Sequence, residues 1–232
     1  MTADKGISII VTGATGLVGA ALVQEAILDP AISKITVLTR RPLAFSHPKI
    51  VSVIHSDYEH YEAVMDIFLE CDAVVWCLGV STSQVSKEEY IRITYDYAIA
   101  CATTMKKVNP MMTFLFVSGS GADQEEKSKL PFARIKGRTE KKLAELGLHS
   151  LIIVRPAAIR PVIRNPNTAL MNKLMSPFFP ALEWVFPNKV IKSTDLAVAM
   201  IRLLKEDSPV ISLARIVENK ELRVLGMKNL GI

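Results

Sequence analysis

The stretch at residues 7–19, Ile-Ser-Ile-Ile-Val-Thr-Gly-Ala-Thr-Gly-Leu-Val-Gly, constrains the fold more than any other part of the chain. An apolar run ends in Gly13, Gly16 and Gly19, and helix-periodic apolar residues follow directly, so the order predicts a strand, a tight turn and a helix. Gly13 allows the turn, Gly16 lets backbone N–H groups approach a phosphate, and Gly19 allows close packing of helix on strand. Because a helix N-terminus attracts anions, the pattern indicates a site for the pyrophosphate of a nucleotide cofactor.

The glycine spacing is G-x-x-G-x-x-G and not the commoner G-x-G-x-x-G. A glycine triplet alone is weak evidence, since a glycine-rich turn between strand and helix can bind nothing. Here the triplet follows an apolar strand, opens a helix and is followed by a second apolar strand at 35–39. This context favours cofactor binding over the simple turn.

The end of the second predicted strand indicates which nucleotide is bound. An NAD site usually has Asp or Glu about twenty residues after the glycines, where it binds the ribose 2′-hydroxyl. In this chain Thr39, Arg40 and Arg41 stand there instead. A guanidinium can hold a 2′-phosphate through two hydrogen bonds, so the two arginines favour NADP over NAD. The alternative is that they form a solvated corner of the protein.

Strand and helix patterns alternate up to about residue 154, which predicts an α/β fold with a doubly wound parallel sheet, the Rossmann fold. Residues 1–232 are expected to form a single NAD(P)-binding domain with its core at 6–154 and a small irregular or helical region at 155–232. The expected strands lie at 7–12, 35–39, 50–55, 73–78, 113–118 and 150–154, and the expected helices at 17–29, 60–70, 87–107 and 132–146.

The region at 155–232 is expected to cover the substrate side, since ligands of open α/β sheets lie beyond the carboxyl ends of the strands. A helix-prone segment at 169–186, a helix at 195–204 and a short strand near 210–213 are expected within it. The segment at 170–186 is rich in Leu, Met, Phe and Trp. Core and lid packing is the simpler interpretation, and an apolar substrate mouth or a peripheral membrane contact is the alternative.

Composition sets further limits. Half of the 232 residues are hydrophobic, as expected for a parallel sheet covered on both faces. The longest apolar runs are shorter than a membrane span and no signal-peptide pattern follows Met1, so a cytoplasmic protein is expected. The three cysteines lack metal-ligand spacing, which favours free thiols and no metal site. The net charge is +5, but the basic residues are scattered, so a small-molecule substrate is expected and nucleic acid is not; the oligomeric state stays open.

Residues 12–19 resemble the phosphate loop of the short-chain dehydrogenase/reductase superfamily, most closely its atypical NAD(P)-binding epimerase/dehydratase-like branch. The resemblance covers roughly residues 7–160 and continues to Arg155-Pro156. It implies that Asp57 contacts the adenine amino group and that the loop after the fourth strand lies beside the adenine and ribose. The cofactor-binding residues expected from the glycine loop, the two arginines and the resemblance are Gly13, Thr15, Gly16, Leu17, Val18, Gly19, Arg40, Arg41, Asp57, Tyr58, Leu78, Gly79, Val80 and Lys136.

The resemblance also implies a catalytic helix, in which one residue is changed. The superfamily's usual pair is Tyr-x-x-x-Lys, one turn apart, where the tyrosine exchanges a proton with the substrate oxygen and the lysine lowers the tyrosine pKa. Here the frame is Phe132-Ala133-Arg134-Ile135-Lys136, so the lysine is present and the phenol is replaced by a phenyl ring. The alternative is a core aromatic and a surface lysine. The catalytic candidates are Lys136, Ser118 and Ser120, with Tyr90, Tyr95 or Tyr97 as other proton donors.

Three functions are compatible with these residues. The first is an NADP-dependent oxidoreductase, acting on a small apolar substrate, in which another group or water supplies the proton. The second is an isomerase, epimerase or dehydratase that uses the bound nucleotide. The third is a non-catalytic NADP-binding sensor or regulatory protein. The oxidoreductase is ranked first because the superfamily consists mostly of enzymes, which is an argument from fold analogy.

Overall fold

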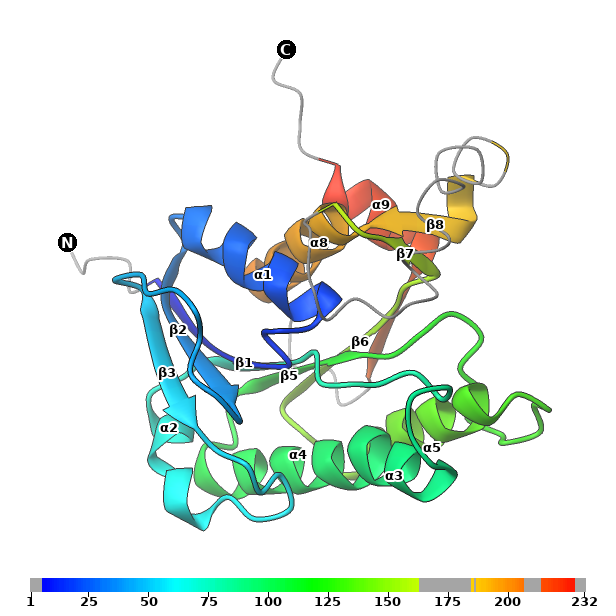
Figure 1. Cartoon of the computed structure of the whole chain (residues 1–232), viewed down its shortest axis with the longest axis horizontal. Coiled ribbons are helices and arrows are strands. Elements are labelled where there is room, and N and C mark those ends of the chain that lie inside the picture. The colour runs from blue at the N-terminus through cyan, green and yellow to red at the C-terminus, as the bar shows by residue number, and fades with distance from the viewer. Residues whose placement is uncertain (1–5, 163–184, 186, 207–213, 228–232) are drawn as a thin grey trace.

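A parallel β-sheet with helices on both faces forms the centre of the computed structural model, which describes residues 6–162, 185, 187–206 and 214–227 (Figure 1). The strand order is β3-β2-β1-β4-β5-β6-β9, and each neighbouring pair is parallel. This arrangement confirms the predicted doubly wound Rossmann fold. The strands are β1 Ile7–Thr12, β2 Ile32–Thr39, β3 Ile50–Ile54, β4 Ala73–Trp76, β5 Thr113–Val117, β6 Ser150–Arg155 and β9 Arg215–Glu218.

The helices form a layer on each face of the sheet, as Figure 1 shows. One layer contains α1 (Leu17–Leu28), α8 (Ser193–Lys205) and α9 (Asn219–Gly226). The other layer contains α2 (Asp66–Leu69), α3 (Lys87–Ile91), α4 (Tyr97–Val108) and α5 (Pro131–Glu145), with the short turns η1 (Glu62–Val64) and η2 (Arg92–Asp96).

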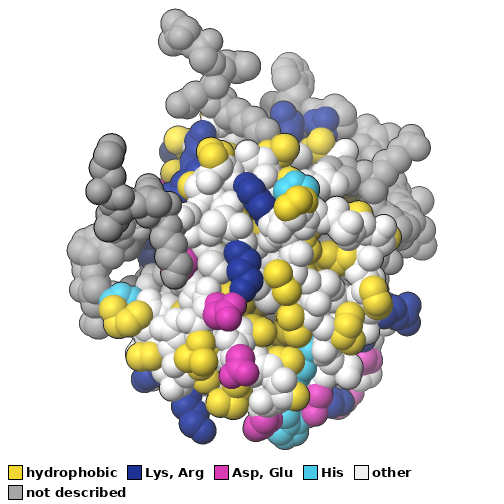
Figure 2. All heavy atoms as spheres, turned by 90° about the vertical axis from the view of Figure 1, so that its left-hand side faces the viewer, with side chains coloured by type: hydrophobic (Ala, Val, Ile, Leu, Met, Phe, Trp, Pro, Cys, Tyr) yellow, Lys and Arg dark blue, Asp and Glu magenta, His cyan; other side chains and the backbone are white. Residues whose placement is uncertain are grey.

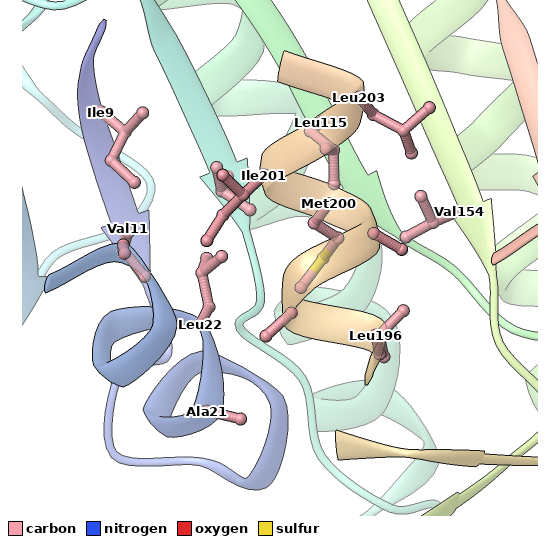
Figure 3. Packing of buried hydrophobic residues seen from close by; sticks show 14 of the residues in the cluster. Ile9, Val11, Ala21, Leu22, Leu115, Val154, Leu196, Met200, Ile201 and Leu203 are labelled. Atoms are coloured by element: carbon pink, nitrogen blue, oxygen red, sulfur yellow. The ribbon is translucent and has the colours of Figure 1, made fainter. Parts of the chain in front are cut away.

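The central strands are apolar throughout because both faces of the sheet are buried. In β1, Ile9 and Val11 point into the core beneath α1 and α8, whereas Ile10 belongs to the core beneath α4 and α5. Figure 3 shows the first of these cores, where Leu22 of α1 lies near Val11 and Met200 of α8 lies over the middle of the sheet. The alternation of side chains along a strand thus divides one apolar run between two cores.

Two predicted helices differ from the structure. The segment at 60–70 contains only the short η1 and α2, and it buries Tyr61, directly before η1, and Phe68 of α2 in the aromatic core. The helix predicted at 87–107 contains a wider π-type turn, η2, between α3 and α4. The carbonyl of Thr94 in this turn accepts a hydrogen bond from the Thr139 hydroxyl of α5, at 3.4 Å.

The sheet and its helical cover continue past the core boundary predicted at residue 154. Strand β9 pairs with β6 and so satisfies the backbone hydrogen bonds along the edge of β6. Helix α8 packs on α1 and buries apolar side chains of the sheet. The helix predicted at 195–204 is α8. The strand predicted near 210–213 lies outside the described residues, as does nearly all of the segment at 169–186.

A second, two-stranded parallel sheet follows β6. It consists of β7 (Ala158–Arg160) and β8 (Val190–Lys192), and η4 (Pro187–Lys189) leads into β8. It lies beside α8 and α9 (Figure 1). These segments stand next to the carboxyl end of β6, on the side where the sequence predicted a substrate-side region.

At the other end of the sheet, β3 is the outermost strand and exposes Val51 and Ile54. Figure 2 shows this side of the molecule, where hydrophobic side chains are interspersed with basic and acidic ones. Within the part of the chain that the structure describes, no helix combines the length and the apolar composition needed to cross a membrane.

Candidate cofactor and substrate site

The glycine loop between β1 and α1 lies where the strand order reverses, at the carboxyl ends of β1 and β4. Gly13 has a φ of +65°, and a Cβ atom there would lie 2.6 Å from the carbonyl oxygen of Cys77. The buried Thr12 hydroxyl accepts a hydrogen bond from the backbone N–H of Leu78 at 3.3 Å. The loop after β1 and the loop after β4 are therefore held against each other at this edge.

The two later glycines have different local roles. Gly16 precedes the first residue of α1 in an extended conformation, and its N–H donates to the Gly13 carbonyl at 2.9 Å. Gly16 has no side chain that could cap this helix end, and the first turn of α1 contains no acidic residue. A Cβ at Gly19 would collide with the carbonyl oxygen of Gly13. Gly19 thus permits the close packing that the sequence predicted, and Gly16 stands at a helix N-terminus suited to an anion.

Arg40 and Arg41, which are expected to favour NADP over NAD, follow the end of β2 and are exposed. The Thr39 hydroxyl donates to the carbonyl of Arg41 at 2.9 Å, which shapes this turn. Arg40 lies close enough to Tyr58 to lower the pKa of that phenol, although burial raises it overall to about 12. The guanidinium of Arg40 and the segment after β3 are therefore neighbours at one edge of the sheet.

The two residues expected at the adenine lie in different environments. Asp57 is exposed, and its carboxylate accepts from the backbone N–H of Glu59 and pairs with the His60 ring at 3.0 Å. The hydrogen bond with His60 lowers the pKa of Asp57 and raises that of His60. Tyr58 is 3% exposed, and its hydroxyl donates to the carbonyl of Leu38. The structure thus places the Tyr58 side chain in the core and leaves the Asp57 carboxylate at the surface.

The loop after β4 begins at Cys77 and Leu78, where the chain contacts Gly13. Leu78 is half-buried against the core, Val80 is partly exposed, and Gly79 is exposed with open space where a Cβ would be. The remaining loop residues, Thr15, Leu17 and Val18, lie at the beginning of α1 on the same edge. The residues predicted from separate parts of the sequence therefore come together along the carboxyl edge of β1, β2 and β4.

A cavity of about 440 Å³ lies at the carboxyl ends of β5 and β6. Phe132, from the first turn of α5, lines it together with segments from β5, β7 and η4. Of the sequence candidates, Ser118 and Ser120 reach the cavity, whereas Tyr90, Tyr95 and Tyr97 do not line it. Its lining residues are Ser118, Gly119, Ser120, Phe132, Pro156, Ala157, Ala158, Ile159 and Lys189.

Lys136 lies one helical turn after Phe132, beneath the backbone of Gly119. Its ammonium group donates to the carbonyl of Val117 at 2.9 Å and lies 5.5 Å from the centre of the Phe116 ring. Burial lowers the pKa of Lys136 to about 8, and the nearby Glu140 acts in the opposite direction. This is not the environment of an ordinary surface lysine.

Ser118 belongs to a buried polar network that the sequence did not indicate. Its hydroxyl donates to Glu140 at 2.5 Å, and the same carboxylate accepts from Arg155 and from the Gln124 amide. Glu140 itself is fully buried. Ser120 differs, because its hydroxyl has no hydrogen-bond partner among the residues that the structure describes. In the sequence, Arg155 appeared only as part of the resemblance, and no local pattern indicated that Glu140 of α5 contacts it.

The strand order, the glycine loop at the point where it reverses and the cavity beside β5 and β6 define an NAD(P)-binding Rossmann protein. The family model described as NAD(P)H-binding matches residues 13–207, which is most of the chain. The chain belongs to this NAD(P)H-binding family.

Two curated relatives illustrate the family. The rat "Protein HTATIP2" is 27% identical over 154 residues, which are 66% of this chain and 62% of that protein. The Candida albicans "Protein FMP52, mitochondrial" is 31% identical over 156 residues, which are 66% of this chain and 67% of that protein. The chain thus matches less than two thirds of the rat relative's length.

Solved structures share the fold at low sequence identity. A short-chain dehydrogenase/reductase family oxidoreductase from Burkholderia thailandensis is 15% identical with a TM-score of 0.69, covering 94% of this chain and 93% of that chain. A UDP-glucuronic acid 4-epimerase from Bacillus cereus in complex with NAD is 13% identical with a TM-score of 0.65, covering 91% of this chain and 78% of that chain. At these identities the likeness shows the fold alone.

Proposed function

We propose that the chain is an NADP(H)-binding oxidoreductase-like protein that acts on a small substrate in the cavity beside Phe132. The observation that carries this proposal is that the glycine loop and the cavity lie along the same edge of the sheet, at the carboxyl ends of its strands. A dinucleotide whose pyrophosphate lies at the N-terminus of α1 extends along this edge in both directions from the point where the strand order reverses. Its adenosine half then lies toward β2 and its nicotinamide half toward β5 and β6.

NADP is proposed over NAD because of the charge after β2. Arg40 and Arg41 are exposed there, where NAD-binding proteins usually place an acid. A guanidinium provides a positive charge and two parallel hydrogen-bond donors for a 2′-phosphate. A neutral ribose hydroxyl is stabilised much less by the same group. The exposed carboxylate of Asp57 is proposed to accept from the adenine amino group. Tyr58 supports this turn from the core through its hydrogen bond to Leu38.

At the other half, Lys136 and the two serines are proposed to surround the nicotinamide ribose and the substrate. The cofactor, when bound, exchanges a hydride with the substrate. Lys136 keeps a positive charge near this position below pH 8, and Gly119 allows its side chain to lie directly beneath the backbone. Phe132 cannot transfer a proton, and the Ser118 hydroxyl is already donated to Glu140. The Ser120 hydroxyl or a water molecule is therefore proposed as the proton donor.

A non-catalytic NADP-binding sensor is the second candidate, and a specific observation favours it. Phe132 lines the cavity one helical turn before Lys136, and a phenyl ring has no proton to transfer. The Ser118 hydroxyl is also held by a buried carboxylate. Such a site can bind a reduced or oxidised nucleotide without turning it over. Epimerase or dehydratase chemistry stays the third candidate, as the names of the solved neighbours include an epimerase.

Binding and turnover measurements test the proposal in sequence. Isothermal titration calorimetry with NADPH and NADH is expected to give at least a tenfold preference for NADPH, because one charge-assisted contact contributes about 1.5–3 kcal/mol. Equal affinities would overturn the choice of cofactor, and absence of binding would overturn the function. Oxidation of NADPH with a panel of small ketones and oxo acids then separates the enzyme from the sensor.

The site of action in the cell is a separate part of the proposal. The sequence favours the cytoplasm, whereas the name of the Candida albicans relative places that protein in mitochondria. Fractionation of cells that produce this chain with a C-terminal tag tests the cytoplasmic location. Recovery of the chain with the mitochondrial fraction would overturn it.

A further inference from the structure

The lining of the cavity beside Phe132 is mostly apolar, and it contains two serines and one cationic residue. Phe132, Pro156 and Ile159 are its larger apolar lining residues, and Lys189 is the last residue of η4, directly before β8. Among the residues that the structure describes, the lining contains no Asp or Glu, and Lys189 has neither an ion pair nor a hydrogen bond through its side chain. Arg155, at the carboxyl end of β6, differs from Lys189, because it is paired with Glu140 and Glu218.

The backbone next to Lys189 is held against the opposite wall of the cavity by one buried side chain. Asn219, which is 4% exposed, donates from its Nδ2 atom to the carbonyl of Asn188 at 2.8 Å. Its Oδ1 atom accepts from the N–H of Ala157, also at 2.8 Å. One amide therefore joins the two segments that line the cavity, although they lie about thirty residues apart in the sequence.

Strand pairing fixes the same two segments a second time. In the two-stranded sheet Ala158 lies opposite Val190 and Ile159 opposite Ile191. The guanidinium of Arg223 in α9 donates to the carbonyl of Val190 at 2.9 Å. The backbone of Lys189 is therefore held in a fixed position relative to Ile159. Only the Lys189 side chain has to become ordered when a ligand binds.

We propose that Lys189 determines substrate specificity by binding the carboxylate of a small apolar acid, whose hydrocarbon part packs against Phe132 and Ile159. The proposal rests on the proposed function, because it treats this cavity as the substrate site. A carboxylate fits the single ammonium group better than a phosphate does, since one lysine neutralises one charge and the lining contains no second cationic side chain. The unpaired Ser120 hydroxyl lies in the same lining and can meet an oxygen next to the acid group.

The test compares two ligands that differ in charge and hardly in shape. Binding of 2-oxohexanoate and of its neutral amide, 2-oxohexanamide, is measured by calorimetry on the full chain, with and without saturating NADP+. Three proteins are compared: the natural chain, Lys189→Gln and Lys107→Gln. Lys107 is an exposed lysine near the C-terminal end of α4, which leads into the amino end of β5, whereas the cavity lies at the carboxyl end. Its replacement changes the net charge by the same amount. The ratio of the two affinities is the readout, because a folding defect or a change in nucleotide affinity affects both ligands alike.

The natural chain and Lys107→Gln are expected to bind the acid about tenfold more tightly than the amide, and the preference is expected to weaken at high salt. In Lys189→Gln the ratio is expected to fall to about one. An equal affinity of the natural chain for acid and amide would overturn the proposal. A preference that survives Lys189→Gln would overturn it too. Retention of NADPH binding in either case shows that the specificity proposal has failed and the cofactor proposal has not.

Discussion

Glu140 and Arg155 form a buried ion pair beneath the cavity, with Nε of Arg155 3.0 Å from Oε1 of Glu140 and Nη2 2.5 Å from Oε2. The Glu140 side chain is completely buried, and that of Arg155 is 16% exposed. The Ser118 hydroxyl donates to the same carboxylate, so the pair connects α5 with the carboxyl ends of β5 and β6. A buried pair of this kind adds little net stability, but removal of one partner leaves the other charged and buried.

Glu140→Gln is therefore expected to lower the free energy of unfolding by about 3–5 kcal/mol, because the Arg155 guanidinium loses its buried counterion. Urea denaturation followed by circular dichroism measures the change. Glu145→Gln is the matched control on the same helix, since the pair of Glu145 with Lys142 is exposed and its loss is expected to leave stability nearly unchanged. A change in Glu140→Gln as small as that of the control would show that the pair is not structurally important.

The lowered pKa of Lys136 predicts a pH dependence of stability. Burial brings this pKa to about 8 in the folded chain, while an unfolded lysine keeps its proton up to about pH 10.4. Between these values the unfolded state binds more protons, so the contribution of Lys136 to the free energy of unfolding rises from about pH 8 to about pH 10. The difference in stability between the natural chain and Lys136→Met is expected to grow in favour of the natural chain over this range. Urea denaturation at four pH values checks this, and Lys107→Met is expected to follow the natural chain throughout.

The sequence predicted the sheet well and the cavity poorly, for a physical reason. The glycines after β1 and the apolar strands are local patterns, and packing of the helices on the sheet follows from them. The contact between Gly13 and Cys77 could be expected, because parallel strands end at one edge. The links of Asn219 to Ala157 and of Glu140 to Arg155 depend on long-range packing of segments whose local sequence is ordinary. The interrupted helix at 60–70 shows the same limit, since its apolar spacing fits a continuous helix and the chain forms η1 and α2 instead.

The glycine loop predicts a separation between folding and cofactor binding. Gly19→Ala is expected to destabilise the fold, because its Cβ would collide with the backbone of Gly13. Gly16 is extended, and a Cβ there would lie 3.1 Å from the Gly13 carbonyl oxygen, whereas a Cβ at Gly19 would collide with that oxygen. Gly16→Val is therefore expected to fold after a small shift and to block the approach of a pyrophosphate. Thermal unfolding with and without NADPH checks both: Gly19→Ala lowers the midpoint without nucleotide, and Gly16→Val loses the shift that NADPH produces. If NADPH still stabilised Gly16→Val, the cofactor would lie elsewhere.

Arg40 is expected to distinguish the two nucleotides. Arg40→Ala removes a guanidinium at the end of β2 and is expected to weaken NADPH binding at least tenfold while it changes NADH binding little. Calorimetry with both nucleotides measures the ratio. Arg138→Ala serves as the control, because Arg138 is an exposed arginine of α5 that pairs with Glu126. If Arg40→Ala lost the same affinity for NADPH and for NADH, Arg40 would contact a part of the nucleotide that both cofactors share and not the 2′-phosphate.

Phe132→Tyr tests whether the cavity is a reductase site that lacks its proton donor. The phenyl ring lines the cavity one helical turn before Lys136, so the new hydroxyl would stand beside the ammonium group and the Ser120 hydroxyl. General acid–base catalysis contributes about 10²–10⁴-fold, and Phe132→Tyr is expected to raise NADPH-dependent reduction of small oxo acids within this range. Phe132→Leu controls for a mere change in packing.

The result separates the proposed functions. A gain in Phe132→Tyr that is lost again in Phe132→Tyr/Lys136→Met would assign the proton transfer to the restored pair, because the lysine then acts through the phenol. Turnover by the natural chain that Phe132→Tyr leaves unchanged would instead make Ser120 the residue to replace, and Ser120→Ala should abolish it. Tight NADPH binding without turnover in the natural chain and in Phe132→Tyr would favour the sensor, since a correctly placed acid would then have nothing to protonate.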